Sequence, residues 1–330
     1  MMLNLKYAQH HRRWRRVRRL GLMAIALLLT MALAIACGSP SPSTAPTASE
    51  TFRTVDHAMG SALVPNEPRR VVVMGTAPLD VAIALGVTPV GAWVYHDFPG
   101  YLGNRTDGIE IISTGGPPNI EAIAKLQPDL ILGSKIGSEA IYPSLVQIAP
   151  TVLSEENGRE GDWEKQLRLY GEALGKSGAA EQRIKDYQTQ LKALQQKLEA
   201  PEDTVVSLVF SFRDYIGFYS HTSFSGSILS DIGFARPKIQ TQPTLSTYLS
   251  IVSKEAFQDL DGDIIFLIVN EHKGSNSLTH DAFVQDPLFS QLSAVKNKQV
   301  YPVKSEVWTA GRNVLAAQQV LKDIGNALAN

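Results

Sequence analysis

Cysteine is nearly absent from this chain, which has only Cys37 among its 330 residues. A lone thiol cannot close an intramolecular disulfide, and it cannot form a zinc site that needs several thiolates. The seven histidines are scattered, and no two of them stand at the i, i+4 spacing that places both imidazoles on one helical face. We therefore expect no direct metal site built from protein side chains.

The signatures of common enzymes are missing as well. No Gly-x-Gly-x-x-Gly follows a predicted strand, and no Gly-x-Ser-x-Gly elbow is present. Residues 171–177 (Gly-Glu-Ala-Leu-Gly-Lys-Ser) resemble a phosphate loop, but one residue is missing between the glycines and the run follows a helical pattern. The sequence therefore favours a protein that is not an enzyme.

Positive charge is scarce outside the amino terminus. Of the 31 Lys and Arg residues, seven lie within the first 19 positions, where there is no Asp or Glu. The rest of the chain carries 24 basic and 32 acidic residues, a formal charge of −8. An acidic body does not match a phosphate backbone, so we expect no nucleic-acid partner.

Residues 1–36 have the layout of a secretory signal peptide. A basic stretch precedes an apolar run over residues 20–36 that ends in small side chains, which is the order of n-region, h-region and cleavage site. Residues 33–38 (Leu-Ala-Ile-Ala-Cys-Gly) resemble a bacterial lipobox. This resemblance implies that Cys37 is acylated and becomes the new amino terminus.

Two alternatives to lipidation are an uncleaved membrane anchor and a secretory signal without a lipid. Each would still carry the rest of the chain across a membrane. Residues 37–50 are mostly Ser, Pro, Thr and Ala, a composition that predicts a flexible tether. We expect a lipid-anchored protein in the periplasm or on the outer face of the bacterial cytoplasmic membrane.

A long helix is predicted over residues 179–200, where no Gly or Pro interrupts the chain before Pro201. Apolar side chains recur there at spacings of three and four, which places them on one helical face: Ile184, Tyr187, Leu191, Leu194 and Leu198. Such a helix is about 30 Å long, the width of a small domain. We interpret it as a connector between two folded lobes.

Short apolar strands alternate with helices on both sides of this connector. In the first half the strand patterns fall at residues 70–75, 90–94, 110–112, 129–132 and 151–153, and in the second half at 204–212, 263–269 and 301–303. In the first half this alternation predicts a parallel sheet covered by helices on both faces. The expected fold is α/β, with two Rossmann-like lobes (residues 51–163 and 201–330) joined by a single long helix within residues 164–200.

Ligands of such sheets bind beyond the carboxyl ends of the strands. The segments that follow the predicted strands are therefore the first places to look for a site. In the first lobe they are residues 75–78, 93–97, 115–119 and 134–137.

Four motifs resemble those of the periplasmic substrate-binding proteins that serve importers of iron-siderophores, cobalamin and haem. They are Asn-Ile-Glu-Ala-Ile at residues 119–123, Leu-Gln-Pro-Asp-Leu-Ile at 126–131, Pro-Asn-Glu-Pro-Arg-Arg-Val-Val at 65–72 and Ile-Ala-Pro-Thr-Val at 148–152. The proline of the second motif ends a helix directly before a buried strand. The motifs occur in the family's order, and the pattern continues over residues 51–330.

This resemblance implies the solute-binding component of an ABC importer. Such a protein captures a ferric siderophore between its lobes and delivers it to a membrane permease, as a monomer without a cofactor of its own. A cobalamin or haem binder is the alternative within the class. An enzyme on a similar bilobed scaffold, or a sensor that signals through a receptor, is the alternative outside it.

A siderophore already surrounds its iron, so the protein needs aromatic walls and a few cations that pair with exposed oxygens. Arg213 follows the first strand of the second lobe, where members of the family often have a cleft arginine. Trp308 and Arg312 precede the last helix, where the family commonly places an aromatic residue near the ligand. A packing tryptophan and a helix-capping arginine are the competing interpretations. The remaining candidates for ligand contact are Trp93, Tyr95, Tyr215, Arg105 and Lys135.

Two glutamates are candidates for docking to the permease. Glu121 and Glu255 each stand near the start of a predicted helix, where a carboxylate is stabilised by the helix dipole in any case. The family resemblance implies that they dock onto permease arginines. One such charge on each lobe would set orientation and encounter rate more than affinity.

Overall fold

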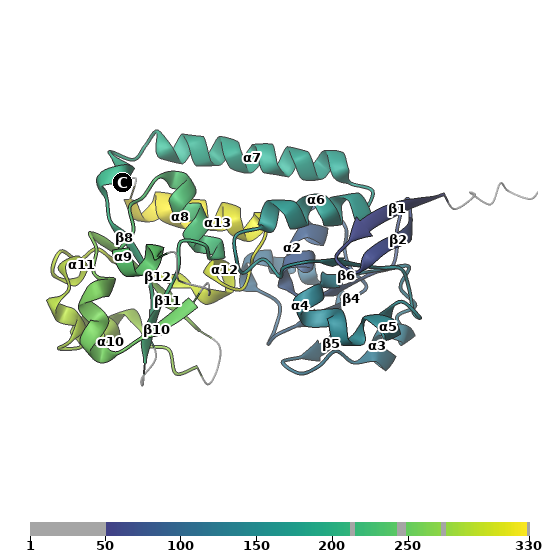
Figure 1. The fold of residues 1–330 in the computed structure, drawn as a ribbon, viewed down its shortest axis with the longest axis horizontal. Coiled ribbons are helices and arrows are strands. Elements are labelled where there is room, and N and C mark those ends of the chain that lie inside the picture. Colours follow the sequence, from purple (N-terminus) through teal and green to yellow (C-terminus); the bar gives the residue numbers. More distant parts are fainter. Residues whose placement is uncertain (1–50, 212–214, 243–248, 272–274, 329–330) are drawn as a thin grey trace, which may run out of the picture. The chain divides into compact units, whose positions relative to one another are not determined.

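The computed structural model describes residues 51–211, 215–242, 249–271 and 275–328 (Figure 1). All of them belong to one compact unit, Thr51–Asn330. The signal peptide, the tether and the lipidated Cys37 lie outside the described residues and stay predictions.

The first lobe contains a five-stranded sheet in which every neighbouring pair is parallel. Its strand order is β5-β4-β3-β6-β7. The strands are β3 (Val71–Met74), β4 (Gly91–Val94), β5 (Glu110–Thr114), β6 (Leu130–Ser134) and β7 (Thr151–Ser154). Each lies where the alternation of apolar runs predicts a strand, so the parallel sheet is confirmed.

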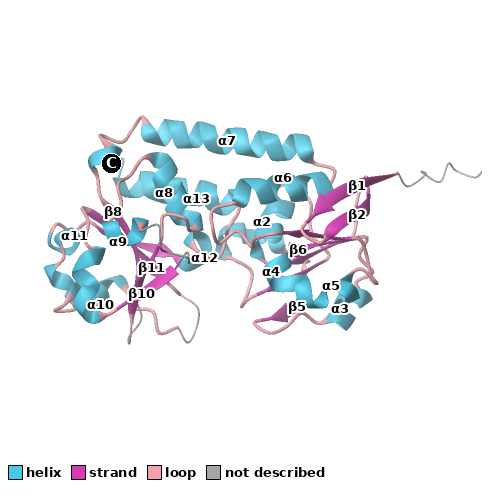
Figure 2. Cartoon of the chain, viewed as in Figure 1, coloured by secondary structure: helices cyan, strands magenta, loops and turns pink. Residues whose placement is uncertain are grey.

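Short helices separate these strands, and an antiparallel hairpin precedes them (Figure 2). The hairpin consists of β1 (Phe52–His57) and β2 (Gly60–Pro65). The helices of this lobe are α2 (Thr76–Ala84), η1 (Gly100–Thr106), α3 (Ile120–Lys125), α4 (Lys135–Ser138), η2 (Glu139–Ile141) and α5 (Tyr142–Leu145).

The second lobe contains a mixed sheet with the order β10-β9-β8-β11-β12. The strands are β8 (Val206–Ser211), β9 (Ile216–Tyr219), β10 (Leu249–Val252), β11 (Ile264–Val269) and β12 (Val300–Lys304). β8, β11 and β12 are parallel, whereas β9 is antiparallel to both β8 and β10. The sequence patterns do not predict β9 or β10. Only residues 212–215 separate β8 from β9, too few for the crossover that a parallel neighbour requires.

The helices of the second lobe flank this sheet (Figure 2). They are η3 (Pro201–Asp203), α8 (Phe224–Ile232), α9 (Lys238–Thr241), η4 (Lys254–Leu260), α10 (His280–Gln285), η5 (Phe289–Gln291), α11 (Ser293–Lys296), α12 (Ser305–Trp308) and α13 (Val314–Leu328). Ser223 caps α8 by accepting the N–H of Gly226, and Gly233 ends that helix with a φ of 106°. These are the residue types that favour helix ends.

The connecting segment forms two helices, α6 (Trp163–Ala173) and α7 (Ser177–Gln195). The chain turns between them at Gly175, whose φ of 69° suits a glycine. α7 begins and ends earlier than residues 179–200, so Leu198 lies beyond its last turn. Ile184, Tyr187 and Leu194 are buried as predicted. In Figure 1, α7 runs alongside both lobes.

One hydrophobic cluster is continuous from the first lobe to the second. It includes β-strand residues of both sheets, such as Val71 and Leu208, together with buried residues of α6, α7 and α13. Two smaller clusters, one in each lobe, also contain strand residues. The connecting helices therefore share a core with both lobes.

Candidate ligand-binding site

A pocket of about 670 Å³ lies between the two lobes at the carboxyl ends of their strands. The first lobe contributes to it from all four segments that the strand ends single out, with Thr76, Tyr95, Pro118 and Ile136 as examples. The second lobe contributes residues from near β8, β9, β11 and α12. The strand-end rule for α/β sheets thus predicts the place of this pocket.

Large apolar and aromatic side chains form much of its wall. Tyr95 is 60% exposed and Ile251 is 63% exposed, and both Ile136 and Tyr215 also expose more than a third of their surface. Such side chains are normally buried, so their gathering in one cavity indicates a surface for an apolar ligand face. Three predicted aromatic contacts line this pocket: Trp93, Tyr95 and Tyr215.

Trp93 and Tyr215 are held in position by their neighbours. The indole N–H of Trp93 donates to the carbonyl of Gly116 at 2.9 Å, which orients the half-buried ring along the wall. The ring of Tyr215 meets that of Phe210 edge to face, with centroids 6.3 Å apart. Aromatic walls ordered in this way lose little conformational entropy when they bind a ligand.

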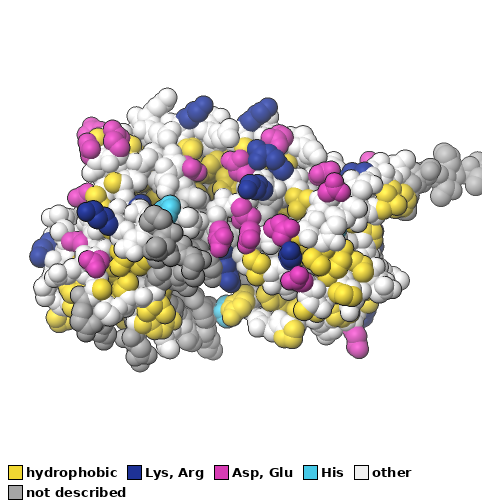
Figure 3. Space-filling model, in the orientation of Figure 1, with side chains coloured by type: hydrophobic (Ala, Val, Ile, Leu, Met, Phe, Trp, Pro, Cys, Tyr) yellow, Lys and Arg dark blue, Asp and Glu magenta, His cyan; other side chains and the backbone are white. Residues whose placement is uncertain are grey.

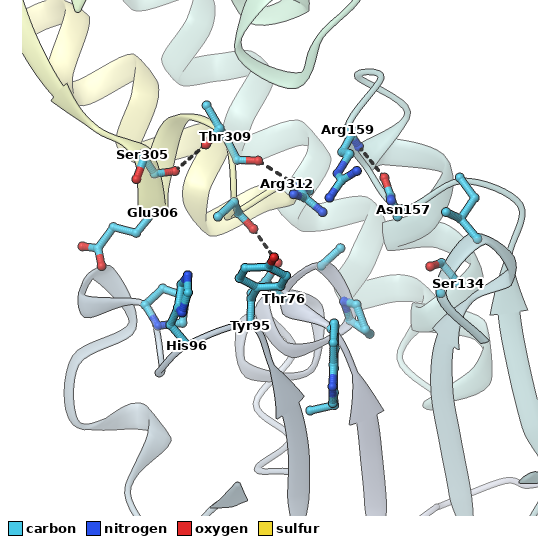
Figure 4. Close-up of a pocket in the computed structure, with 18 of the residues that line it drawn as sticks. Thr76, Tyr95, His96, Ser134, Asn157, Arg159, Ser305, Glu306, Thr309 and Arg312 are labelled. Atoms are coloured by element: carbon cyan, nitrogen blue, oxygen red, sulfur yellow. Dashed lines mark hydrogen bonds between the residues drawn. The ribbon is translucent and has the colours of Figure 1, made fainter. Parts of the chain in front are cut away.

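Two arginines line one side of the pocket. Arg312 lies between α12 and α13, and Arg159 lies in the loop between β7 and α6. Gly158, with a φ of 80°, brings the two segments together, because a Cβ built there would be 2.7 Å from the carbonyl oxygen of Arg312. Figure 4 shows both guanidinium groups on the same side. Two adjacent cations favour an anionic ligand group.

The backbone near these arginines is constrained as well. Arg312 has a φ of 59°, in the left-handed region, and its Nε donates to the carbonyl of Thr309 at 2.8 Å. The backbone N–H of Arg159 donates to Asn157 Oδ1 at 3.2 Å. Arg312 is one of the predicted contacts. Arg159 is not. It lies in the loop that follows the predicted strand at residues 151–153, which is where ligand contacts are expected in such a sheet.

The other side of the pocket carries an acidic side chain, Glu306. Glu306 Oε2 accepts the backbone N–H of Gly100 at 2.9 Å, a hydrogen bond that joins α12 of the second lobe to η1 of the first. His96 lies on the same side as Glu306, and Asp97 also lines the pocket. The pocket is therefore cationic at one side and acidic at the other.

A buried carboxyl group, that of Asp80, joins the two lobes. Asp80, in α2, is 0% exposed and accepts three hydrogen bonds: from the hydroxyl of Tyr101 at 2.9 Å and from the backbone N–H groups of Leu315 and Ala316 at 2.9 and 3.0 Å. The last two belong to the first turn of α13, so Asp80 caps a helix of the opposite lobe. Burial raises the pKa of Asp80 to about 7, while its hydrogen bonds act in the opposite direction.

Three predicted contacts do not line the pocket. Trp308 is 1% exposed, because its ring packs against Phe266 at 4.8 Å and its indole N–H donates to Asp323 at 2.9 Å. Arg105 donates to the carbonyls of Leu102 and Tyr101 in η1. Lys135 forms an ion pair with Glu155 at 3.3 Å. The side chain of Trp308 is therefore packed in the core, in agreement with the competing interpretation of this residue as a packing tryptophan.

The other candidates lie on the surface or outside the described residues. Arg213 is among the residues that the structure does not describe, so its contact with a ligand stays a prediction. Glu121 is exposed in the first turn of α3, next to the capping Asn119. Glu255 falls in η4, and its side chain lies outside the described part of the structure.

The described residues contain neither a metal-binding cluster nor a membrane-spanning helix. In this part of the chain, no three His, Cys, Asp or Glu side chains gather in a way that could hold a metal ion. No helix there combines the length and the hydrophobicity needed to cross a membrane. On the face that Figure 3 shows, Lys and Arg are interspersed with Asp and Glu, so this face presents no basic stripe.

Comparison with known proteins places the pocket in a family context. The family described as periplasmic binding protein matches residues 71–307. YfiY of Bacillus subtilis (strain 168), named a probable siderophore-binding lipoprotein, is 34% identical over 295 residues, covering 86% of this chain and 89% of YfiY. YfmC of the same organism, named an Fe(3+)-citrate-binding protein, is 28% identical over 283 residues, covering 84% of this chain and 86% of YfmC.

A solved structure extends the comparison to three dimensions. Staphylococcus aureus SirA complexed with staphyloferrin B aligns with a TM-score of 0.72 and 29% sequence identity. The alignment covers 83% of this chain and 98% of the SirA chain, so it includes both lobes.

Proposed function

The chain belongs to the periplasmic binding protein family, and we propose that it is the solute-binding component of an ABC importer for a ferric siderophore. The siderophore is captured in the pocket between the lobes and delivered to a membrane permease. The protein performs no chemistry on its cargo. It binds, orients and releases it.

The adjacent guanidinium groups of Arg159 and Arg312 are the observation that carries this proposal. They offer paired N–H donors to the carboxylate or other oxygen donors that a ferric complex exposes. The exposed aromatic and aliphatic side chains that line the same pocket suit the carbon skeleton of the chelator. The iron arrives already coordinated, so the pocket needs no metal ligands of its own.

Tryptophan fluorescence tests the proposal directly. Trp93 lines the pocket, whereas Trp163 and Trp308 are buried in the core, so bound ligand should quench Trp93 in particular. The protein is titrated with ferric citrate, a ferric hydroxamate, a ferric catecholate, haem and cobalamin. We expect saturable quenching by at least one ferric siderophore, and Trp93→Phe should abolish most of that signal.

Arginine variants test the contact itself. Arg159→Ala and Arg312→Ala should each weaken binding of the responding ferric complex at least about tenfold, the scale of one hydrogen bond to a charged group. Arg168→Ala is the matched control, because Arg168 pairs with Glu164 and Glu181 outside the pocket. Unchanged affinity in both pocket variants, or quenching by haem or cobalamin alone, would refute the proposal.

Delivery to the membrane completes the proposed function. Glu121 and Glu255 dock the loaded protein onto arginines of the permease, one from each lobe. Acylated Cys37 holds the monomeric protein at the outer face of the bacterial cytoplasmic membrane, on the tether of residues 37–50. The similarity to a relative named as a lipoprotein supports this location. Metabolic labelling with a radioactive fatty acid, compared with Cys37→Ser, tests the acylation.

A further inference from the structure

The two ends of the ligand pocket carry opposite charges. We name the side of Arg159 and Arg312 the arginine end, and the side of Glu306 the acidic end; all three residues line one cavity. In Figure 4, Glu306 lies with His96 at one side, the two arginines lie at the other, and Thr76 and Tyr95 stand between them. A ligand that fills the cavity therefore meets both ends.

Glu306 is fixed at the acidic end. Its Oε2 accepts the N–H of Gly100 at 2.9 Å, and a Cβ on Gly100 would stand 3.1 Å from its Oε1. A carboxylate offers about four lone-pair sites, so this single bond leaves it able to accept further donors. The nearby Lys304 forms its ion pair with Glu271 at 3.1 Å. Glu306 thus contributes a positioned negative charge to the wall of the cavity.

This arrangement has opposite effects on ligands of different charge. An all-anionic ferric complex is attracted at the arginine end and repelled at the acidic end. A complex with a carboxylate at one terminus and a protonated amine at the other is attracted at both. Such charge pairs act more strongly once a bound ligand has displaced the water between the charges.

We infer that Glu306 makes the pocket selective for ferric siderophores that carry both a carboxylate and a protonated amine, with the amine at the acidic end. This inference deepens the proposed function and rests on it.

Three ferric trihydroxamates test the contributions of the arginine end and the acidic end one at a time. Ferrioxamine G has a terminal carboxylate and a terminal amine, its N-acetyl derivative has only the carboxylate, and ferrioxamine B has only the amine. Wild-type protein should bind ferrioxamine G at least about tenfold more tightly than either of the others, since each lacks one charged hydrogen-bonding group. Fluorescence titration gives the three dissociation constants.

Variants of Glu306 separate its charge from its contact between the lobes. In Glu306→Gln the amide oxygen still accepts from Gly100, yet the charge is gone, so the preference for ferrioxamine G over its N-acetyl derivative should fall to about onefold. Glu306→Gln should also bind ferric citrate more tightly than wild type. Glu110→Gln is the matched control, because Glu110 is exposed at the amino-terminal end of β5, away from the pocket; it should keep the wild-type preference.

Several outcomes would overturn the inference. Equal binding of ferrioxamine G and its N-acetyl derivative by wild type would do so, as would an unchanged preference in Glu306→Gln. A preference lost in Glu306→Ala but kept in Glu306→Gln would show that only the contact with Gly100 matters. Wild-type protein that binds ferric citrate and no ferrioxamine would also overturn it, and the proposed function would stand. If the wild-type protein bound no ferric complex, both this inference and the proposed function would be refuted.

Discussion

Replacing Asp80 with alanine removes the acceptor that holds the amino terminus of α13 against the first lobe. Three donors, the Tyr101 hydroxyl and the N–H groups of Leu315 and Ala316, would lose their partner in a site with no exposure to solvent. Each buried donor without a partner costs about 1–3 kcal/mol. Allowing for water that enters the vacated space, we expect a loss of roughly 3–5 kcal/mol in the free energy of unfolding.

Urea denaturation followed by circular dichroism measures this loss. Two further variants calibrate it: Tyr101→Phe removes one of the three bonds and should cost about 1 kcal/mol, while Asp281→Ala, at a side chain that is 84% exposed, should cost almost nothing. Ordinary surface substitutions change the free energy of unfolding by up to about 0.5 kcal/mol. A change no larger than this in Asp80→Ala would refute the stabilising role of Asp80.

The same carboxyl group makes stability depend on pH. Burial raises the pKa of Asp80 to about 7, above the value of about 3.9 for an exposed aspartate. Between these values the folded protein keeps a proton that the unfolded chain has released, so this group lowers the free energy of unfolding as pH rises through the window. Wild-type protein should therefore lose stability relative to Asp80→Asn between pH 5 and 7.5. A gap that grows in favour of wild type over this range would contradict the shift.

Further substitutions test the site and the docking surface. Gly158→Ala should cost about 1–2 kcal/mol for the left-handed backbone alone, and it should also weaken ligand binding, because the new Cβ meets the backbone of Arg312 at 2.7 Å; titration beside urea denaturation checks both. Trp308→Phe should lower the free energy of unfolding by about 2 kcal/mol through lost packing, with ligand affinity unchanged. Weaker ligand binding without a loss of stability would instead indicate that Trp308 contacts the ligand. Glu121→Lys and Glu255→Lys should each abolish uptake of radioactive iron in cells while the purified protein keeps its affinity, and a loss of affinity would remove the docking assignment.

Much of the fold follows from local patterns in the sequence. The strands of the first lobe coincide with short apolar runs, and a proline or glycine stands near several of their ends. The apolar spacing of three and four marks the buried face of α7 at Ile184, Tyr187 and Leu194. These features are predictable because periodicity and turn chemistry depend on a few neighbouring residues.

The second sheet shows where local patterns are insufficient. The local sequence of β9 does not predict that this strand pairs antiparallel with β8. That pairing follows from the short connection and from which sheet edge is available. Likewise, the position of Trp308 before the last helix is readable from the sequence, but the direction of its ring is not. Its contacts with Phe266 and Asp323 orient the Trp308 ring toward the core.

The sequence alone determined the alternation of strands and helices, the connecting helices, and the loops from which a binding site could be built, since each depends on residues close together in the chain. Tertiary structure decided which of those loops meet. Arg159 joins Arg312 because Gly158 allows a close backbone approach, and Asp80 caps α13 across 235 residues of sequence. Such neighbours carry no shared local signal, because packing between the two lobes brings them together.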